Sequence, residues 1–498
     1  MLRWSTAFAA VLATAAAMPC PNCVLSRVSA PTVMAGPTGD DFDSPLAAAT
    51  LPNGTVVAFS ANQETYIVSF GDNVTSTLPA PRKTNLGPNS SDVNALDHCG
   101  SWLNAVYADG GILRGWYHEE WRCDYARDSY TNKSIAYAES SDGGATWVKV
   151  GYPHNQVIVA PFGNTSAVHQ TGEGDQGVTF DGSFYYLYFR EWDPPGRSGT
   201  CGVARATAAS GGRPGTFFKL HNGQWSEPGV HGASTAVPIP GTAVHYRGPT
   251  KDFVAIGGAG PWGWGHGFGL GFAGNATWAD GWAMSAPLVY NDQLEWNRVA
   301  PVPELFAYPT LVGAAGSQAV TDEGYLTYTY LEPNATFADR YLVRRPYKLT
   351  TLAEPHPAWL PPAAVDLDVY TCAGGDMWVT STLVREPCAH QDVLALVMSA
   401  PSPTNASTKL VDCYIPAWDD HMVAVGDECS SGGMVVLRTL GWVLAAPASF
   451  PAGGLTPTPL YRCFDATTRH HALTTDSLCA GYGKTEFLVG YGFKAPGV

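Results

Sequence analysis

Acidic residues stand at three widely separated places, each beside a run of residues typical of a β-strand. Asp43 opens "DSPLAAAT", Glu119 and Glu120 close the aromatic run "GWYHEEW", and Asp175 precedes "QGVTF". Cleavage of a glycosidic bond needs two carboxyl groups that face the bond, one protonated and one ionised. These segments could supply the acids of a hydrolytic site if the fold brings them together.

The adjacent acids Glu119 and Glu120 cannot both enter one site, because successive side chains of a strand point to opposite faces. An acid beside an aromatic ring such as Trp121 is desolvated, which raises its pKa as a proton donor requires. We therefore expect Glu120 to be the proton donor, with Glu119 as the alternative. An exposed acidic pair beside a disulfide between Cys99 and Cys123 would account for the same residues without catalysis.

Three further polar residues are candidates for substrate binding. His118 directly precedes the acidic pair, and His245 and Arg247 lie in "HYRGPTKD". A histidine can orient a carboxyl group, and an arginine can hold a sugar hydroxyl or a carboxylate. For His245 and Arg247 a structural role is the more common explanation.

An aromatic stripe alternates with glycine in "GGAGPWGWGHGFGLGFAG". The two-residue period of a strand puts Trp262, Trp264 and His266 on one face, where they could stack against the apolar face of a sugar. An inner strand whose glycines permit close packing explains the segment equally well.

Several function classes are disfavoured by what the sequence lacks. It contains no Gly-x-Ser-x-Gly elbow, no zinc-ligand spacing and no dinucleotide or phosphate loop, so we expect no cofactor and no metal. The net charge is −15 with only 28 Lys and Arg, which disfavours nucleic acid and anionic membranes as partners. The expected ligand is a carbohydrate, and the chain is expected to be a monomer.

The elements that must position these residues are short strands. Gly (54), Pro (38) and aromatic residues (12%) are abundant while charged residues are few (14%), a composition typical of strands joined by tight turns. Units of turn and aromatic strand begin near residues 43, 98, 175, 245 and 308. This spacing predicts an all-β fold with a β-propeller of five blades, and a pair of β-sandwiches is the alternative.

The segment "SSDGGATW" resembles the Asp-box of sialidases and related β-propellers. Ser140, Asp142, Gly144, Thr146 and Trp147 occupy its defining positions. The resemblance implies a hairpin in the outer part of a blade, away from the axis. It supports a fold and no particular substrate.

The start of the first unit resembles the Asp-x-Pro opening of five-bladed glycoside hydrolases of the arabinanase and invertase type. That resemblance implies that Asp43 is the catalytic base or nucleophile, and that Asp175 is a third acid that orients the others. Turn-forming aspartates are the alternative explanation for both.

Two other functions stay open. A sialidase would need three arginines and a Tyr-Glu nucleophile pair, but the Arg-Ile-Pro signature of that family is absent. A non-catalytic glycan-binding or adhesion protein would use the propeller as a scaffold.

The C-terminal part is a separate region of three short units. A Pro-rich linker is expected over residues 353–365, between a propeller over 18–352 and a domain over 366–498. Three cysteine pairs, each 16 residues apart, suggest one disulfide per unit and a small three-fold, trefoil-like β domain. These cysteines are Cys372, Cys388, Cys413, Cys429, Cys463 and Cys479.

The last unit resembles the tail repeat of many secreted hydrolases and lectin-like proteins. The resemblance implies a carbohydrate-binding or surface-adhesion module. The residues that match the repeat are Leu460, Tyr461, Arg462, Thr468, His471, Thr474, Thr475 and Asp476.

The N-terminus predicts secretion. Residues 1–17 combine one basic residue, a short apolar stretch and a small-residue cleavage site, which is typical of a signal peptide. A buried N-terminal helix is the alternative. Eleven cysteines and eight Asn-x-Ser/Thr sequons fit a glycosylated extracellular protein. The sequons are at Asn53, Asn73, Asn89, Asn132, Asn164, Asn275, Asn334 and Asn405.

Overall fold

The computed structural model describes residues 24–39, 42–124, 130–161, 170–192, 200–258, 267–279, 282–285, 288–290, 306–313, 315–316, 320–331, 339–351, 363–372, 377–380, 388–402, 405–448 and 455–494. Within these ranges the chain is built from β-strands and two single-turn 3-10 helices, η2 (Ala208–Ser210) and η4 (Glu428–Ser430). The predicted signal peptide lies outside them. No helix in the described ranges is long and apolar enough to cross a membrane.

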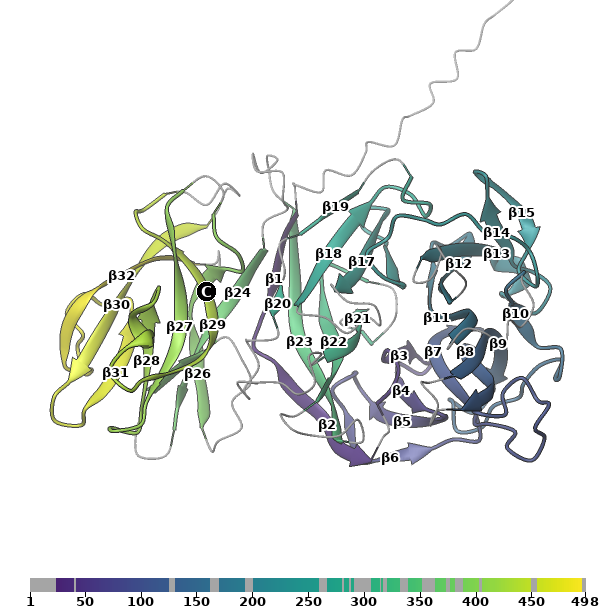
Figure 1. The fold of residues 1–498 in the computed structure, drawn as a ribbon, viewed down its shortest axis with the longest axis horizontal. Coiled ribbons are helices and arrows are strands. Elements are labelled where there is room, and N and C mark those ends of the chain that lie inside the picture. The colour runs from purple at the N-terminus through teal and green to yellow at the C-terminus, as the bar shows by residue number, and fades with distance from the viewer. Residues whose placement is uncertain are drawn as a thin grey trace, which may run out of the picture.

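Strands β3 to β23 form five antiparallel blades around an axis, as predicted (Figure 1). Blade one contains β3 (Ala47–Thr50), β4 (Val56–Asn62), β5 (Glu64–Gly71) and β6 (Thr77–Lys83). Blade two contains β7 (Gly100–Asp109), β8 (Ile112–Asp124), β9 (Tyr130–Ser140) and β10 (Gln156–Ile158). Blade three contains β11 (Gln170–Phe180), β12 (Phe184–Trp192), β13 (Cys201–Thr207), β14 (Phe218–His221) and β15 (Gln224–Pro228).

The fourth blade contains β16 (Ala243–Arg247), β17 (Asp252–Gly258), β18 (Gly267–Ala273), β19 (Trp282–Met284) and β20 (Val289–Tyr290). The fifth contains β21 (Phe306–Gly313), β22 (Glu323–Leu331) and β23 (Asp339–Thr351).

The N-terminal strands complete the fifth blade. Both β1 (Val24–Val28) and β2 (Thr32–Gly39) pair antiparallel with β23, so strands from the two ends of the propeller share one sheet. This pairing closes the ring and leaves fewer unpaired strand edges.

Each blade is buried on both faces because it packs between two neighbours. Phe59 of blade one and Leu103 of blade two share one apolar cluster, and Trp116 of blade two and Phe189 of blade three share the next. This double burial explains why the blade strands are rich in apolar residues on both faces.

The turn after β9 is held by bonds from its backbone to two of its own side chains. The backbone N–H of Gly144 donates to the Ser140 hydroxyl (2.9 Å), and that of Thr146 donates to Asp142 (2.9 Å). Trp147 is buried edge-on against Phe59. The turn lies between β9 and β10, the last two strands of blade two in chain order.

The tail domain consists of strands β24 to β32 in three units. The units contain β24 (Ala363–Thr371), β25 (Met377–Thr380) and β26 (Ala389–Met398); β27 (Ser407–Ile415), β28 (Asp420–Val425) and β29 (Val435–Leu444); and β30 (Thr456–Asp465), β31 (His470–Thr474) and β32 (Lys484–Lys494). The third strands, β26, β29 and β32, pair with one another, which gives the domain its three-fold arrangement.

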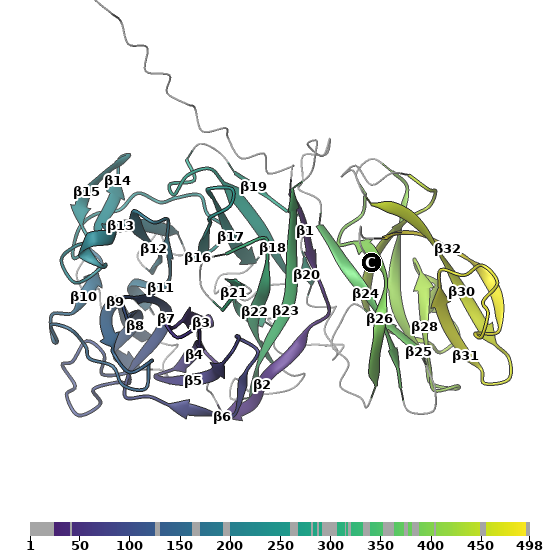
Figure 2. The ribbon, with the colours of Figure 1, turned by 180° about the vertical axis from the view of Figure 1, so that it is seen from behind.

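The tail joins the propeller through β1, which pairs in parallel with β24 (Figure 2). The predicted linker over 353–365 is too long at its C-terminal end, because residues 363–365 belong to β24 and are buried. Arg27 of β1 binds Asp366 of β24 through two bonds of 2.6 and 3.0 Å across this junction.

The disulfides follow the predicted pairing. The three pairs of the tail form as Cys372–Cys388, Cys413–Cys429 and Cys463–Cys479, and Cys99 pairs with Cys123. Cys201 is a buried free thiol, and Cys20 and Cys23 lie outside the described residues.

Candidate active site

A cavity of about 490 Å³ lies where the inner parts of the blades meet. All five blades contribute to its lining: Asp43 belongs to the first, Glu120 to the second, Asp175 to the third, Ala243 to the fourth and Tyr308 to the fifth. The structure therefore brings together all three acids that the sequence favoured.

Asp175 enters the cavity from an irregular point in β11. The register of β11 against β12 shifts between Gly174 and Gly177, and Asp175 has a φ of +48°. Gly174 is needed here because a Cβ at that position would lie 2.6 Å from the ring of His118. The bulge thus aims the Asp175 carboxylate, which is 34% exposed, at the cavity.

The charge on Asp175 is stabilised by its neighbours. Burial alone would raise the pKa of this carboxyl group, but Lys133 and then His118 lower it well below its ordinary value. Asp175 is therefore ionised across the range in which proteins are stable.

His118 stands between Asp175 and Glu120. The backbone N–H of Asp175 donates to Nδ1 of His118 (2.9 Å), and Nε2 lies 3.0 Å from Oε1 of Glu120. Because Nδ1 accepts a bond, the ring proton of the neutral histidine lies on Nε2 and is donated to Glu120. One imidazole therefore links two of the three acids.

Glu120 also binds Lys133, whose Nζ lies 3.1 Å from Oε1. Burial lowers the pKa of Lys133, but Glu120 and then Asp175 raise it above its ordinary value, so the ammonium group persists. The prediction that Glu120 is the proton donor therefore stays a prediction, and its nearest charged neighbour is a cation. An ammonium group at this distance favours the ionised carboxylate.

Asp43 is held by two residues of blade five. Its Oδ1 accepts a bond from the Tyr308 hydroxyl (2.8 Å) and lies 2.7 Å from Arg340. Burial and the Asp43 carboxylate raise the pKa of Tyr308 well above its ordinary value, so the phenol stays protonated and donates. Asp43 is thus an ionised carboxylate with a fixed orientation.

Positive φ angles occur at three non-glycine residues of the lining. They are Gln63 (+57°), Asp175 (+48°) and Tyr308 (+53°), and both Asp175 and Tyr308 lie at register shifts of inner strands. Such conformations cost free energy and persist where the surrounding fold imposes them, which is common at functional sites.

Several lining residues were not predicted from the sequence. They include two basic residues, Lys133 and Arg190, which reach the cavity from β9 and β12, and Trp102, which is 7% exposed. The sequence did contain a signal for Lys133, which begins the apolar strand segment "KSIAYA". A buried lysine is rarely unpaired, so a lysine in such a strand indicates an acidic partner nearby.

Glu119 lies on the other face of β8, away from the cavity, so it is not a catalytic candidate. It is fully buried, and Ser134 and Gln156 donate hydrogen bonds of 2.5 and 3.0 Å to its Oε1. Burial raises the pKa of Glu119 to about 7, although these two bonds lower it.

His245 and Arg247 are structural residues, and their predicted contact with substrate is wrong. His245 is buried between blades, where its Nε2 accepts a bond from the backbone N–H of Leu311 (3.2 Å). Arg247 is 2% exposed and forms two bonds with Asp252, of 2.9 and 2.7 Å. Neither side chain lines the cavity.

The aromatic stripe and the sequons are the remaining predicted residues. Trp262, Trp264 and His266 lie outside the described residues, as do the sequons at Asn164 and Asn334. Asn132 is 3% exposed within β9, so it cannot carry a glycan in this fold, and the prediction of a modification there is wrong. The remaining five sequons stay predictions.

No metal cluster was found in the part of the chain that the structure describes: no three His, Cys, Asp or Glu side chains there are arranged to hold an ion.

No family model and no curated protein matches the chain. Similar solved structures include an α-L-arabinofuranosidase from Lactobacillus brevis (12% identity, TM-score 0.39, 62% of this chain and 91% of that one). They also include a family 117 glycoside hydrolase from Zobellia galactanivorans (13%, 0.38, 66% and 92%) and an arabinanase from Bacillus subtilis (10%, 0.34, 63% and 97%).

Proposed function

We propose that the propeller is a glycoside hydrolase that cleaves O-glycosidic bonds in its axial cavity. The observation that carries the proposal is the convergence of Asp43, Glu120 and Asp175, from three blades, on one cavity of about 490 Å³. Paired carboxyl groups across a pocket are what glycoside cleavage requires. The volume suits a few sugar residues.

Each acid has a different environment and hence a different role. Asp43, bonded to Tyr308 and near Arg340, is the ionised base or nucleophile. Asp175 stays ionised, and its backbone N–H donates to Nδ1 of His118, so it orients the imidazole whose Nε2–H is donated to Glu120. Glu120 is the proton donor in its protonated form. Because the ammonium group of Lys133 favours the ionised form of Glu120, acidic conditions are needed to protonate it.

The sialidase alternative has less support. The described lining of the cavity contains two arginines, Arg190 and Arg340, where a sialidase needs three to hold the substrate carboxylate. Arg340 lies 2.7 Å from Asp43.

We also propose that the protein is secreted. The described residues contain four disulfides, which form and persist in oxidising compartments.

The test is hydrolysis of a panel of aryl glycosides and plant and algal polysaccharides by the purified full chain. Asp43→Asn and Glu120→Gln should each lower kcat by about 10³-fold on any hydrolysed substrate. Glu119→Gln is the matched control, because the neighbouring acid points away from the cavity and should keep its activity near pH 6. NMR of the first product anomer then distinguishes retention from inversion.

A folded chain that hydrolyses nothing on the panel, yet binds an oligosaccharide through Trp102 and Asp43, would favour the non-catalytic glycan-binding alternative. Equal loss of activity in Glu119→Gln and Glu120→Gln would contradict the assignment of the acids.

A further inference from the structure

A second cavity of about 400 Å³ lies in the tail domain, apart from the axial site. The first unit lines it through β24, β25 and β26, and the third unit through β30, β31 and β32. Arg27 of β1 also reaches it from the propeller side. The cavity is therefore the seam between the first and third units, beside the junction of the two domains.

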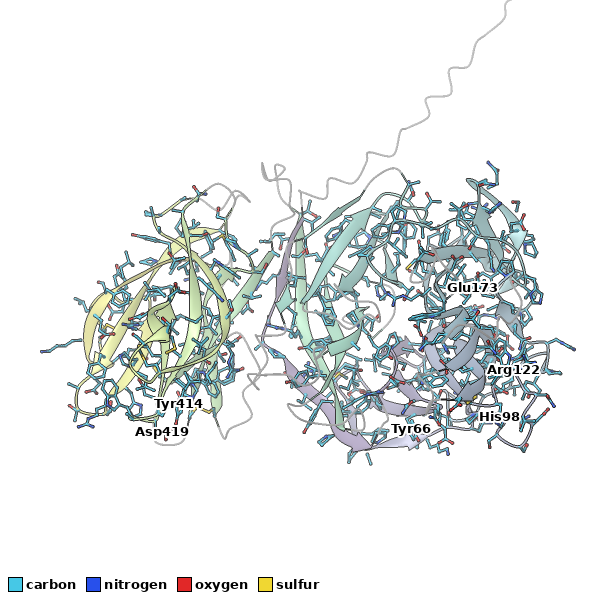
Figure 3. The ribbon with its side chains drawn as sticks, viewed as in Figure 1. Tyr66, His98, Arg122, Glu173, Tyr414 and Asp419 are labelled. Carbon is cyan, nitrogen blue, oxygen red and sulfur yellow. A yellow bond between two sulfur atoms is a disulfide. The ribbon has the colours of Figure 1, made fainter. Side chains whose placement is uncertain are left out.

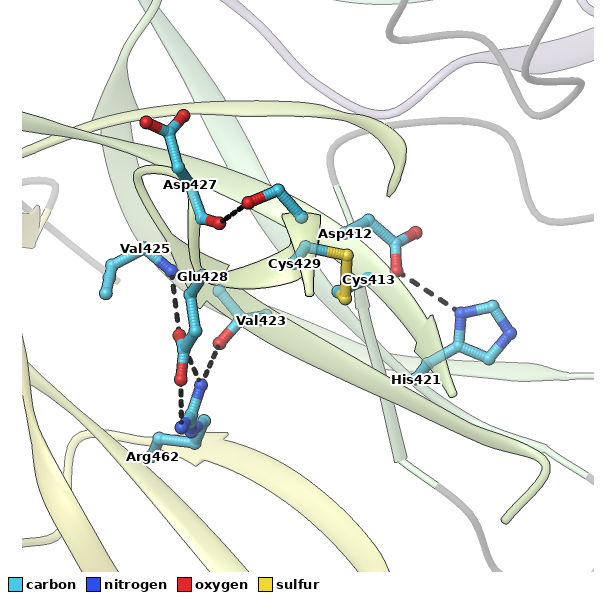
Figure 4. Close-up of a disulfide and its surroundings, with 10 residues drawn as sticks. Asp412, Cys413, His421, Val423, Val425, Asp427, Glu428, Cys429 and Arg462 are labelled. Atoms are coloured by element: carbon cyan, nitrogen blue, oxygen red, sulfur yellow. Dashed lines mark hydrogen bonds and ion pairs between the residues drawn. A yellow bond between two sulfur atoms is a disulfide. The ribbon is translucent and has the colours of Figure 1, made fainter. Parts of the chain in front are cut away.

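The seam between the second and third units is closed by charged side chains (Figure 4). The guanidinium group of Arg462 binds the Glu428 carboxylate through two bonds of 2.8 and 2.7 Å, and it binds Glu486 at 2.6 Å. His471 also bonds Asp420 across this seam, at 2.5 Å. These charged side chains thus bind the two units to each other across the seam.

The seam between the first and second units is closed as well. Nε1 of Trp378 donates to Asp412 (3.0 Å), and the ring of His421 lies 4.2 Å from that of Trp378. The space among these side chains, His471 and Leu473 of the third unit is about 10 Å³, which is close to the least that one water molecule needs. Of these two spaces in the tail, the one between the first and third units is much the larger, at about 400 Å³ against about 10 Å³.

The open seam has the chemistry of a sugar site. Gln391, Asp392 and Thr475 offer amide, carboxylate and hydroxyl groups at its rim, while Leu394 and Phe493 form an apolar floor. Tyr482, 37% exposed, lines the same cavity and presents an aromatic face. Polar groups around an apolar surface match a sugar ring, which has hydroxyls at its edge and C–H groups on its face.

The charges favour a neutral ligand. Arg27 donates two hydrogen bonds to Asp366, whose carboxylate neutralises the charge of the guanidinium group. Lys494 and Asp392 contribute one charge of each sign. A phosphate or sulfate group would find no excess of cations.

We propose that this seam binds one or two residues of a neutral carbohydrate chain and thereby anchors the protein to a glycan. The site is independent of catalysis in the axial cavity. Its position beside β1 would hold a polymer close to the propeller.

The test is isothermal titration of the full chain carrying Glu120→Gln, which prevents turnover, with neutral xylo-, arabino-, gluco- and galacto-oligosaccharides. We expect a carbohydrate that binds at the seam, and Tyr482→Ala should weaken that binding about tenfold. Asp392→Ala provides a second variant whose folding is safe, because its only side-chain bond within the described contacts is to the adjacent Val393 N–H (2.7 Å).

The matched control is Trp418→Ala. Trp418 is also an exposed aromatic residue (40%), but it lies in the turn between β27 and β28 and does not line the seam. Figure 3 labels Asp419, the next residue of this turn. Affinity that falls in Trp418→Ala and stays unchanged in Tyr482→Ala and Asp392→Ala overturns the proposal. So does the absence of binding by every oligosaccharide. Failure of hydrolysis alone leaves seam binding intact, so the two proposals fail separately.

Discussion

The axial cavity and the closed seams of the tail both contain buried charged groups, but they use them differently. In the seam of the second and third units, Arg462 satisfies two carboxylates and fills the space between them. In the axial cavity, Asp175 keeps a third of its surface exposed although His118 and Lys133 stabilise its charge. Buried charge stabilises structure where partners fill the space, and it makes a reactive site where a cavity stays open beside it.

Asp175→Asn should have a larger effect than the substitutions that follow. Loss of the carboxylate should lower kcat about 10²-fold, because His118 loses one of the groups that orient it toward Glu120. Steady-state kinetics measure it, with Asp322→Asn, a half-exposed acid away from the cavity, as the control. An unchanged kcat would mean that Asp175 has a structural role, like the carboxylates that bind Arg462 in the tail.

Glu119→Gln tests the face of β8 that points away from the axial cavity. The pKa of Glu119 is raised from 4.5 to about 7 in the folded protein. The contribution of Glu119 to the free energy of unfolding should therefore fall by about 3 kcal/mol as pH rises from 4.5 to 7. Below pH 4.5 both folded and unfolded forms are protonated, so no difference remains there. The glutamine variant should therefore gain stability relative to wild type as pH rises.

Chemical denaturation of both proteins at several pH values measures this difference. If the free energies of unfolding of the two proteins change with pH in parallel, the pKa of Glu119 is not raised. Glu323→Gln is the control, since that side chain is 62% exposed.

Arg462→Met should destabilise the tail by about 2 kcal/mol, because Glu428 and Glu486 lose their shared cation while remaining partly hydrated. Activity of the propeller should be unchanged in the same samples. Urea denaturation followed by circular dichroism measures the effect. Lys348→Met, which removes an exposed ion pair with Glu323, should change stability by less than about 1 kcal/mol.

Lys133→Gln should have the smallest effect, and it tests the charge beside Glu120 directly. Removing the ammonium group favours the protonated form of Glu120, so the alkaline limb of kcat/KM should move up by about one pH unit. A pH–rate profile measures it. A uniform loss of rate with the limb unmoved would mean that Lys133 only positions its neighbours.

Much of the architecture could be predicted because it depends on local patterns. The blade openings near Asp43 and Asp175 and the Ser140–Trp147 turn follow from strand periodicity and turn chemistry. The equal spacing of the tail cysteines likewise predicted their pairing. The assignments of His245, Arg247 and Asn132 failed because burial by a neighbouring blade leaves no mark in the sequence around a residue.

An all-β chain of five blades and three disulfide-closed units could be predicted from the residues alone, as could acids at blade openings. The fold was needed to show which of two adjacent glutamates faces the cavity, and that Lys133 and Arg340 lie against its acids. Strand alternation is local and readable in a sequence, whereas the field at a carboxylate depends on side chains that the ring brings together from distant blades.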